Sequence, residues 1–263
     1  MRFRKKLYIC TFNQQNNQNL TNTNNMKNFS FSRKVRILSL LLLLVSTTAW
    51  GQEFDVLKYE NPEATVKSIG KSWAKTPLKV AKTGNMNRNF AKAFCSQYPK
   101  YAPNAAMLLY LKNTAKYDPN KDHYYVDDAP KNGYIKCDMM AQCDYMTEIC
   151  YWKRQNGHSL VGVLLQVGHE GEGTKTDYAM LFYDYNPSTG TMTPDTKMYQ
   201  TVKNIVAKHR GCANFTLPKE GKDIEVYYIY FTHTDEYDFI WEDCRLKWGN
   251  NTFKEIKEET GTF

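Results

Sequence analysis

The sequence has 263 residues, of which 42% are hydrophobic and 14% aromatic. This composition excludes a wholly disordered chain, which would bury too little apolar surface to fold. The net charge of +8 comes from residues 1–51, which hold eight Lys and Arg and no Asp or Glu, so the rest of the chain holds 27 residues of each sign. A neutral remainder gives no electrostatic reason to expect nucleic-acid binding.

Residues 26–51 have the three parts of a secretory signal peptide. Three basic residues precede the uncharged apolar run Ile37–Val45, and mostly small residues follow it. The ending Ala49-Trp50-Gly51 has small residues where a signal peptidase needs them, so we expect cleavage before Gln52. The pattern predicts a protein exported to the periplasm or the extracellular space.

The apolar run is too short for a membrane anchor. The uncharged segment ends at Gln52, whereas a helix that crosses a bilayer needs about 20 apolar residues. We therefore expect no stable membrane span after signal cleavage. Residues 1–25 precede a second methionine, Met26, and are rich in Asn and Gln. This composition predicts a disordered extension or a mis-assigned translation start.

We predict that residues 52–263 form a single domain, because they contain no Pro-rich or Gly/Ser-rich linker. Its first part, residues 52–115, predicts three helices. Pro62 marks the start of the first, Pro99 ends the second, and Pro103 precedes the third. The apolar residues with helical spacing are Val66, Ile69 and Trp73, then Phe90, Phe94 and Tyr98, then Met107, Leu108 and Leu111.

Residues 122–258 predict a β-rich part, because apolar residues recur there with a period of two between turn signals. The dipeptide Asn156-Gly157 between two such runs predicts a tight hairpin. One further helix is expected in this part, with Asp195 as its cap and Gly211 as its stop. The predicted strands are Tyr134–Met139, Thr147–Arg154, Ser159–Gly168, Asp177–Tyr185, Val226–Phe231, Phe239–Trp248 and Thr252–Ile256.

Two of these strands, Ser159–Gly168 and Val226–Phe231, are apolar on both faces, which requires layers on both sides of the sheet. The predicted fold class is therefore α+β. N-terminal helices pack on a mainly antiparallel, hairpin-rich β-sheet that is either curled or backed by a second layer.

Six cysteines follow the signal peptide, and an even count in an exported chain allows disulfides. Six cysteines permit 15 connectivities, so the pairing cannot be deduced, and the alternative is that several are small buried hydrophobic residues. The candidates for disulfides are Cys95, Cys137, Cys143, Cys150, Cys212 and Cys244.

No linear motif of a catalytic, cofactor or metal site occurs in the chain. It lacks a Gly-x-Ser-x-Gly elbow, a His-Glu-x-x-His pair, a Walker loop and a Gly-x-Gly-x-x-Gly turn. No two cysteines have the spacing of a zinc pair. The segment Asp118–Asp122 begins like a calcium loop but lacks the glycine and the final glutamate. We therefore predict no catalytic residue, no metal and no cofactor.

Loop and aromatic residues are the remaining candidates for a site. His169, Glu170 and Glu172 form a polar loop between two strands. Tyr183 and Tyr185 alternate with Phe182 on one strand, and their hydroxyl groups suit a sheet margin next to the turn that follows. The competing interpretation is that strand aromatics fill the core. We predict ligand binding at these five residues and place Phe182 in the core.

Three segments resemble uncharacterised exported proteins of Gram-negative bacteria that carry signal peptides. They are residues 132–136, which read Asn-Gly-Tyr-Ile-Lys, residues 150–158, which read Cys-Tyr-Trp-Lys-Arg-Gln-Asn-Gly-His, and residues 182–187, which read Phe-Tyr-Asp-Tyr-Asn-Pro. The resemblance covers the β-rich part and implies export and a β-rich fold. It implies no activity and no site residues.

Two functional readings follow from these observations. The first is an exported non-enzymatic domain that binds a protein, peptide or glycan, or that serves the cell envelope. The second is a secreted hydrolase whose polar residues come together from separate loops, which would leave no linear motif. The ligand and the oligomeric state are not encoded in any motif of the sequence.

Overall fold

Residues 54–55, 58–59, 61–119, 123–139, 145–168, 176–209, 212–231 and 239–262 are described by the computed structural model. Side chains are not described for residues 176, 229–231, 239–241 and 257–262. Contacts between Cα atoms group Glu53–Phe263 into one compact unit. All elements considered below belong to this unit.

Four α-helices occur in the described residues, and their starts are fixed by side-chain caps at three positions. Asn61, Asn85 and Asp195 accept hydrogen bonds from backbone N–H groups of the first turn, at 3.1, 3.1 and 2.9 Å. The helices are α2 (Pro62–Ser72), α3 (Met86–Gln97), α4 (Ala102–Lys112) and α5 (Thr196–Val206), with short 3-10 turns η2 (Trp73–Lys75) and η3 (Thr114–Lys116).

A seven-stranded antiparallel sheet forms the centre of the unit. Its order is β1-β7-β6-β5-β4-β3-β2, so the five strands from β2 to β6 follow one another in space as they do in the chain. The strands are β1 (Leu78–Lys79), β2 (Tyr124–Ala129), β3 (Tyr134–Met139), β4 (Tyr145–Lys153), β5 (Ser159–Gly168), β6 (Thr176–Asn186) and β7 (Thr191–Pro194).

A second antiparallel sheet has four strands in the order β11-β10-β9-β8. A register shift between Asp243 and Cys244 marks a bulge in β10 where it pairs with β11. The strands are β8 (Cys212–Thr216), β9 (Ile224–Phe231), β10 (Phe239–Gly249) and β11 (Thr252–Thr262).

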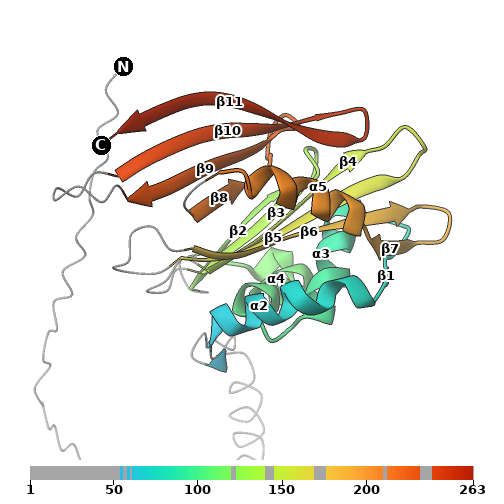
Figure 1. The fold of residues 1–263 in the computed structure, drawn as a ribbon. Helices are drawn as coiled ribbons and strands as arrows, with labels where there is room; N and C mark the ends of the chain where they lie inside the picture. The colour runs from blue at the N-terminus through green and yellow to red at the C-terminus, as the bar shows by residue number, and fades with distance from the viewer. Residues whose placement is uncertain are drawn as a thin grey trace, which may run out of the picture. The chain divides into compact units, whose positions relative to one another are not determined.

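The seven-stranded sheet is covered on both faces, as Figure 1 shows. Helices α2, α3 and α4 pack on one face, where Val163, Leu181 and Phe94 belong to one apolar core. The four-stranded sheet and α5 pack on the other face, where Leu164, Phe182 and Val226 belong to a second core. The two cores explain why β5 is apolar on both sides.

The predicted α+β fold with a mainly antiparallel, hairpin-rich sheet is confirmed, and the second layer is a separate four-stranded sheet. The predicted hairpin is present, with β5 at the expected bounds and Gly157 at φ 81° in the turn. Strands β1, β2, β7 and β8 were not predicted individually. They are short, and β2 also has the adjacent charged residues Asp127 and Asp128 on opposite faces, which weakens the alternation that identifies a strand.

Candidate functional site

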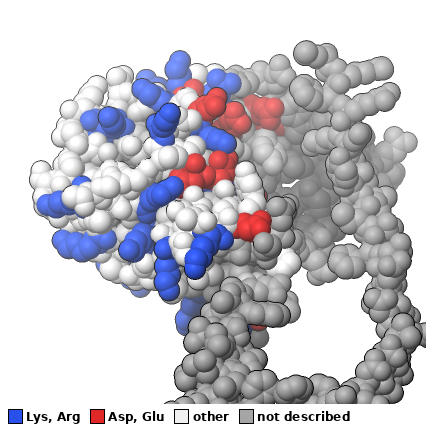
Figure 2. All heavy atoms as spheres, turned by 180° about the vertical axis from the view of Figure 1, so that it is seen from behind, with Lys and Arg blue, Asp and Glu red and all other residues white. Residues whose placement is uncertain are grey.

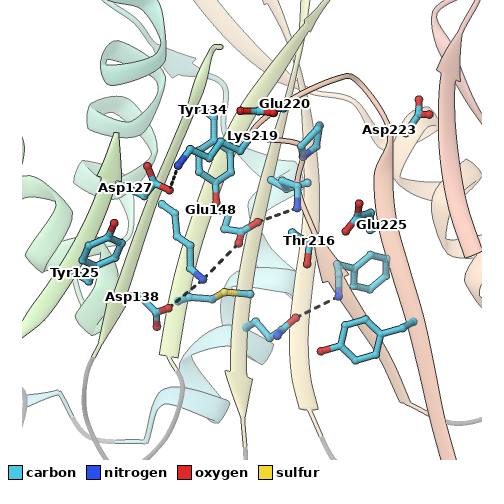
Figure 3. A pocket seen from close by; sticks show the side chains of 17 residues that line it. Tyr125, Asp127, Tyr134, Asp138, Glu148, Thr216, Lys219, Glu220, Asp223 and Glu225 are labelled. Carbon is cyan, nitrogen blue, oxygen red and sulfur yellow. Dashed lines mark hydrogen bonds and ion pairs between the residues drawn. The ribbon is translucent and has the colours of Figure 1, made fainter. Parts of the chain in front are cut away.

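A cleft of about 760 Å³ opens where the second sheet leaves part of the first sheet uncovered. One wall consists of side chains from β2 to β5, and the other consists of β8, β9 and the connection between them (Figure 3). The lining residues are Tyr125, Asp127, Tyr134, Lys136, Asp138, Met146, Glu148, Gln166, Phe215, Thr216, Leu217, Pro218, Lys219, Glu220, Asp223, Glu225 and Tyr227.

Strand alternation places the polar residues of the first wall on one face. On β2, Tyr125 and Asp127 face the cleft, whereas Val126 between them packs in the core under the helices. The register then aligns three charged residues across neighbouring strands, because Asp127 pairs with Lys136 and Lys136 pairs with Glu148. The result is a row of alternating charges along the floor of the cleft.

Glu148 is the most deeply buried carboxyl group of the cleft, with an exposed fraction of 2%. Its Oε2 accepts a hydrogen bond of 2.8 Å from the backbone N–H of Leu217, and its Oε1 lies 3.7 Å from Lys136 Nζ. Burial raises the pKa of Glu148, and the Leu217 N–H, Lys136 and a hydrogen bond with Tyr134 oppose that rise. Glu148 therefore joins β4 to the residues that follow β8.

Two lysines neutralise part of the acidic lining. Lys136 Nζ lies 3.0 Å from Asp138 Oδ2 in addition to its contact with Glu148. Lys219 Nζ lies 2.6 Å from Asp127 Oδ2 and connects the β8–β9 connection to β2 across the cleft. The Lys219–Asp127 ion pair and the Leu217–Glu148 hydrogen bond connect the two walls (Figure 3).

The opposite wall carries three more carboxylates, Glu220, Asp223 and Glu225. Asp223 Oδ1 accepts a hydrogen bond of 3.0 Å from the backbone N–H of Trp248. No ion pair of Glu220 or Glu225 is found among the residues that the structure describes. With six carboxyl groups and two lysines, the lining has an excess of negative charge.

Tyrosines line the cleft beside the carboxylates. Tyr125 and Tyr227, on opposite walls, are 47% and 39% exposed. Large aromatic side chains with this exposure are uncommon among the described residues, where only five large hydrophobic side chains are exposed. Rings next to carboxylates offer flat faces that attract cations and aliphatic stems.

The charge distribution on the side of the molecule turned away from the viewer in Figure 1 is uneven. Figure 2 shows acidic side chains gathered in a few patches, with lysines and arginines spread over the rest of that face. The cleft itself has six carboxyl groups and two lysines, a local excess in a domain whose Lys and Arg equal its Asp and Glu in number.

A second cavity of about 440 Å³ lies between α2, α5 and β6. Its lining is largely apolar, with Val66, Leu181 and Val202 among its residues and with Lys67, Lys71 and Lys203 as its charged members. No carboxylate is among the described residues that line it. The clustered carboxylates therefore distinguish the larger cleft.

The two tyrosines predicted to form a recognition surface are in the core, so that prediction was wrong. Tyr183 and Tyr185 are 0% and 4% exposed. The Tyr183 ring packs edge-on against Trp73 with centroids 5.4 Å apart, and the Tyr185 ring packs against Phe90 at 4.9 Å. Helices α2 and α3 and the turn η2 cover this face of β6, and the opposite side, with Phe182 at 0%, is core as expected.

The other predicted site residues, His169, Glu170 and Glu172, lie outside the described residues. No disulfide joins any two of the described cysteines, and Cys143 lies outside the described residues. Cys95 is fully buried and burial raises the pKa of its thiol, which fits the alternative that several cysteines are small buried hydrophobic residues. The described cysteines are Cys95, Cys137, Cys150, Cys212 and Cys244.

The cleft carboxylates were not singled out from the sequence. One signal was present: on β3, Tyr134, Lys136 and Asp138 alternate with the apolar residues Ile135 and Cys137. Such a strand has one polar face that remains in contact with water. The pattern does not indicate which distant segments form the opposite wall.

No family model, no curated protein and no solved structure matches this chain. Among the described residues, no helix has the length and apolar character needed to cross a membrane. The interpretation of the site therefore depends on its geometry and charge.

Proposed function

We propose that this chain is an exported, non-enzymatic binding protein and that its acidic cleft binds a basic peptide segment of another protein. The observation that carries the proposal is the excess of carboxyl groups over lysines in a cleft with two fixed walls. The signal-peptide pattern of residues 26–51 supports the exported location.

Charge complementarity favours a basic ligand over a neutral or acidic one. Glu220 and Glu225 are exposed carboxylates on the wall that also carries Asp223, and Asp138 lies on the other wall. An arginine or lysine side chain that enters between these walls gains charge-assisted hydrogen bonds. A neutral glycan would leave most of these carboxylates without a charged partner.

The exposed tyrosines fit the same kind of ligand. A lysine or arginine that lies on Tyr125 or Tyr227 places its positive charge near the ring face and its aliphatic stem on the ring. Protein interfaces are enriched in tyrosine for this combination of apolar area and polar edge. A peptide with alternating basic and apolar residues therefore matches the lining better than a peptide that contains only basic residues.

A hydrolase is the second candidate, because Glu148 is buried in the cleft with a raised pKa, as a general acid would be. Its contacts favour a structural role. Oε2 accepts from the Leu217 N–H and Oε1 faces Lys136, so both oxygens already have partners in the protein. A general acid needs an oxygen within reach of its substrate.

Fluorescence anisotropy of the purified chain tests the proposal. We expect a labelled Lys/Arg-containing peptide to bind more tightly than an Asp/Glu peptide or a neutral oligosaccharide, with affinity falling between about 0.05 M and 0.5 M salt. The double variant Glu220→Gln with Glu225→Gln should lose at least about threefold in affinity. The matched control, Asp55→Asn with Glu63→Gln, removes two carboxylates that do not line the cleft and should bind as the native chain does.

Equal binding of acidic and basic peptides, or an unchanged affinity in the Glu220/Glu225 variant, would contradict the proposal. Turnover of a peptide or glycan that is abolished by Glu148→Gln in a folded variant would support the hydrolase instead.

A further inference from the structure

A compact cluster of nitrogen, sulfur and oxygen donors lies between the end of α5 and the four-stranded sheet. His209 follows α5, Cys244 lies on β10 and Glu255 lies on β11. A ring nitrogen of His209, Cys244 Sγ and a carboxylate oxygen of Glu255 all lie within 4.8 Å of one another. None of these residues lines the acidic cleft.

The His209 ring is held in one orientation by its neighbours. Its Nε2 lies 2.5 Å from Glu255 Oε1, and its Nδ1 lies 3.3 Å from Glu242 Oε1. The ring stacks on Tyr228 with centroids 4.2 Å apart and an angle of 9° between the planes. The His209 side chain and Cys244 are each only 3% exposed, so these two donors are shielded from water.

The three donors are those of a transition-metal site. Thiolate and imidazole are ligands for zinc and related ions, whereas calcium and magnesium prefer oxygen alone. Glu242 faces the ring nitrogen that is turned away from Glu255, and such a carboxylate fixes the tautomer of a metal-binding histidine. Nε2 is then left with its lone pair directed at the side of the cluster where Glu255 lies.

The separations are close to those that a metal requires. Zinc bonds of about 2.0 to 2.3 Å place tetrahedral ligand atoms roughly 3.3 to 3.7 Å apart. His209 Nε2 and Glu255 Oε1, which are 2.5 Å apart, therefore have to separate by about 1 Å. Donor atoms as far apart as the 4.8 Å limit have to approach one another by about 1 Å. Glu255 is at the surface end of the cluster, with a side chain 17% exposed, and can make this adjustment.

We propose that His209, Cys244 and Glu255 bind one zinc-type divalent cation, with Glu242 as the residue that orients His209. The cation connects the segment after α5 to strands β10 and β11, because each supplies one ligand. The ion would join the segment after α5 to the hydrogen-bonded β10–β11 ladder. Three protein ligands leave the fourth position of a tetrahedral zinc ion to water. A bound ion stabilises the folded chain by mass action.

The competing arrangement is a protonated His209 between Glu242 and Glu255, with no metal. That arrangement uses the same two carboxylates and leaves Cys244 as a thiol, whose Sγ donates to Tyr228 Oη at 3.8 Å. The state of the sulfur therefore distinguishes the two, because only a metal site binds Cys244 Sγ as a thiolate.

Metal titration of the chelator-treated full chain tests the proposal. We expect one Zn²⁺ per chain by calorimetry, a rise in melting temperature on zinc addition, and thiolate charge-transfer absorption with Co²⁺. Cys244→Ser and His209→Ala should each weaken zinc binding at least tenfold, and Glu242→Gln should weaken it about tenfold. Cys212→Ser and His158→Ala are matched controls outside the cluster and should bind zinc as the native chain does.

Absence of stoichiometric zinc binding by the native chain would overturn the proposal. Binding that persists unchanged in folded Cys244→Ser, or cobalt spectra without thiolate absorption, would overturn it as well. The cobalt spectrum is measured on the native chain, so it decides the question even where a variant does not fold.

Discussion

The carboxyl group of Glu148 is the clearest case in which one residue couples folding to the candidate site. It is placed in a buried position by β4 and receives the Leu217 N–H from a segment 69 residues away. Burial works against its charge, and the hydrogen bond with the backbone partly compensates. The pKa of Glu148 therefore depends on the packing of both walls, because each wall supplies one of its partners.

The raised pKa of Glu148 predicts a pH dependence of stability. The folded protein binds this proton more tightly than the unfolded chain, so stability falls as pH rises from the ordinary glutamate pKa to the raised value. Glu148→Gln removes this dependence and keeps an oxygen for the Leu217 N–H. We expect the free energy of unfolding of the native chain to fall relative to that of the variant as pH rises above the ordinary glutamate pKa of about 4.3. Urea denaturation at a series of pH values measures the difference. A free energy of unfolding of the native chain that rises relative to that of the variant over the series would contradict the prediction.

Tyr183 and Tyr185 show where residue-level reasoning failed. The prediction that both side chains lie on one face of β6 and Phe182 on the other is confirmed. A hydroxyl group does not require a position at the surface, because the ring supplies most of the area that a core buries. Packing of Trp73 and Phe90 against the two rings decided their burial.

At the scale of elements, local signals were strongest where a turn has special backbone requirements. The β4–β5 hairpin is closed by hydrogen bonds from Gly157 N–H to Arg154 C=O at 3.2 Å and from Arg154 N–H to His158 C=O at 3.0 Å. Gly157 adopts φ 81°, a conformation in which a Cβ is unfavourable. Asn156-Gly157 therefore identified both strands from sequence.

Gly157→Val is predicted to destabilise the chain by more than about 1 kcal/mol. A Cβ at this position would meet no atom within 4 Å, so the cost comes from the backbone conformation and not from a clash. Gly249→Val is the matched control, because Gly249 has open space as well but no positive φ. Chemical denaturation of the two variants measures the difference. Equal midpoints for Gly157→Val and the native chain would mean that the turn tolerates a side chain.

Strands without such turn signals were not predicted from the sequence. Strand β8 has five residues and follows α5 closely, and β2 carries Asp127 on its cleft face and Asp128 on the face under the helices. In both, the period-two pattern is short or interrupted, so a strand and a polar connection look alike. Pairing with β9 and β3 completes their hydrogen bonds in the structure.

At the scale of the whole molecule, export is the prediction that depends least on tertiary structure. A signal peptide is recognised before the protein folds, so the prediction depends only on the basic residues, the apolar run and the small-residue ending of residues 26–51. Expression of a tagged full chain should yield a mature N-terminus at Gln52, and N-terminal sequencing of the exported fraction measures it. Recovery of the chain in membranes with residues 26–51 intact would show that the segment acts as an anchor.

The sequence by itself determined the charge balance of the domain, the α+β class, most of the helices and the strands bounded by strong turns. These features depend on composition, period and local backbone chemistry, which act within a few residues of the chain. It also indicated that β5 needed cover on both faces. It could not indicate that the cover is a second sheet that leaves β2 and β3 exposed to a cleft.

Tertiary structure alone decided both candidate sites, because each is assembled across long stretches of chain. Lys219 and Asp127 are 92 residues apart, and His209 and Glu255 are 46 apart. Strand alternation shows which side chains share a face, but the packing of one layer on another decides which faces meet. The carboxylates of the cleft and the donors of the His209 cluster acquire their chemistry only through that packing.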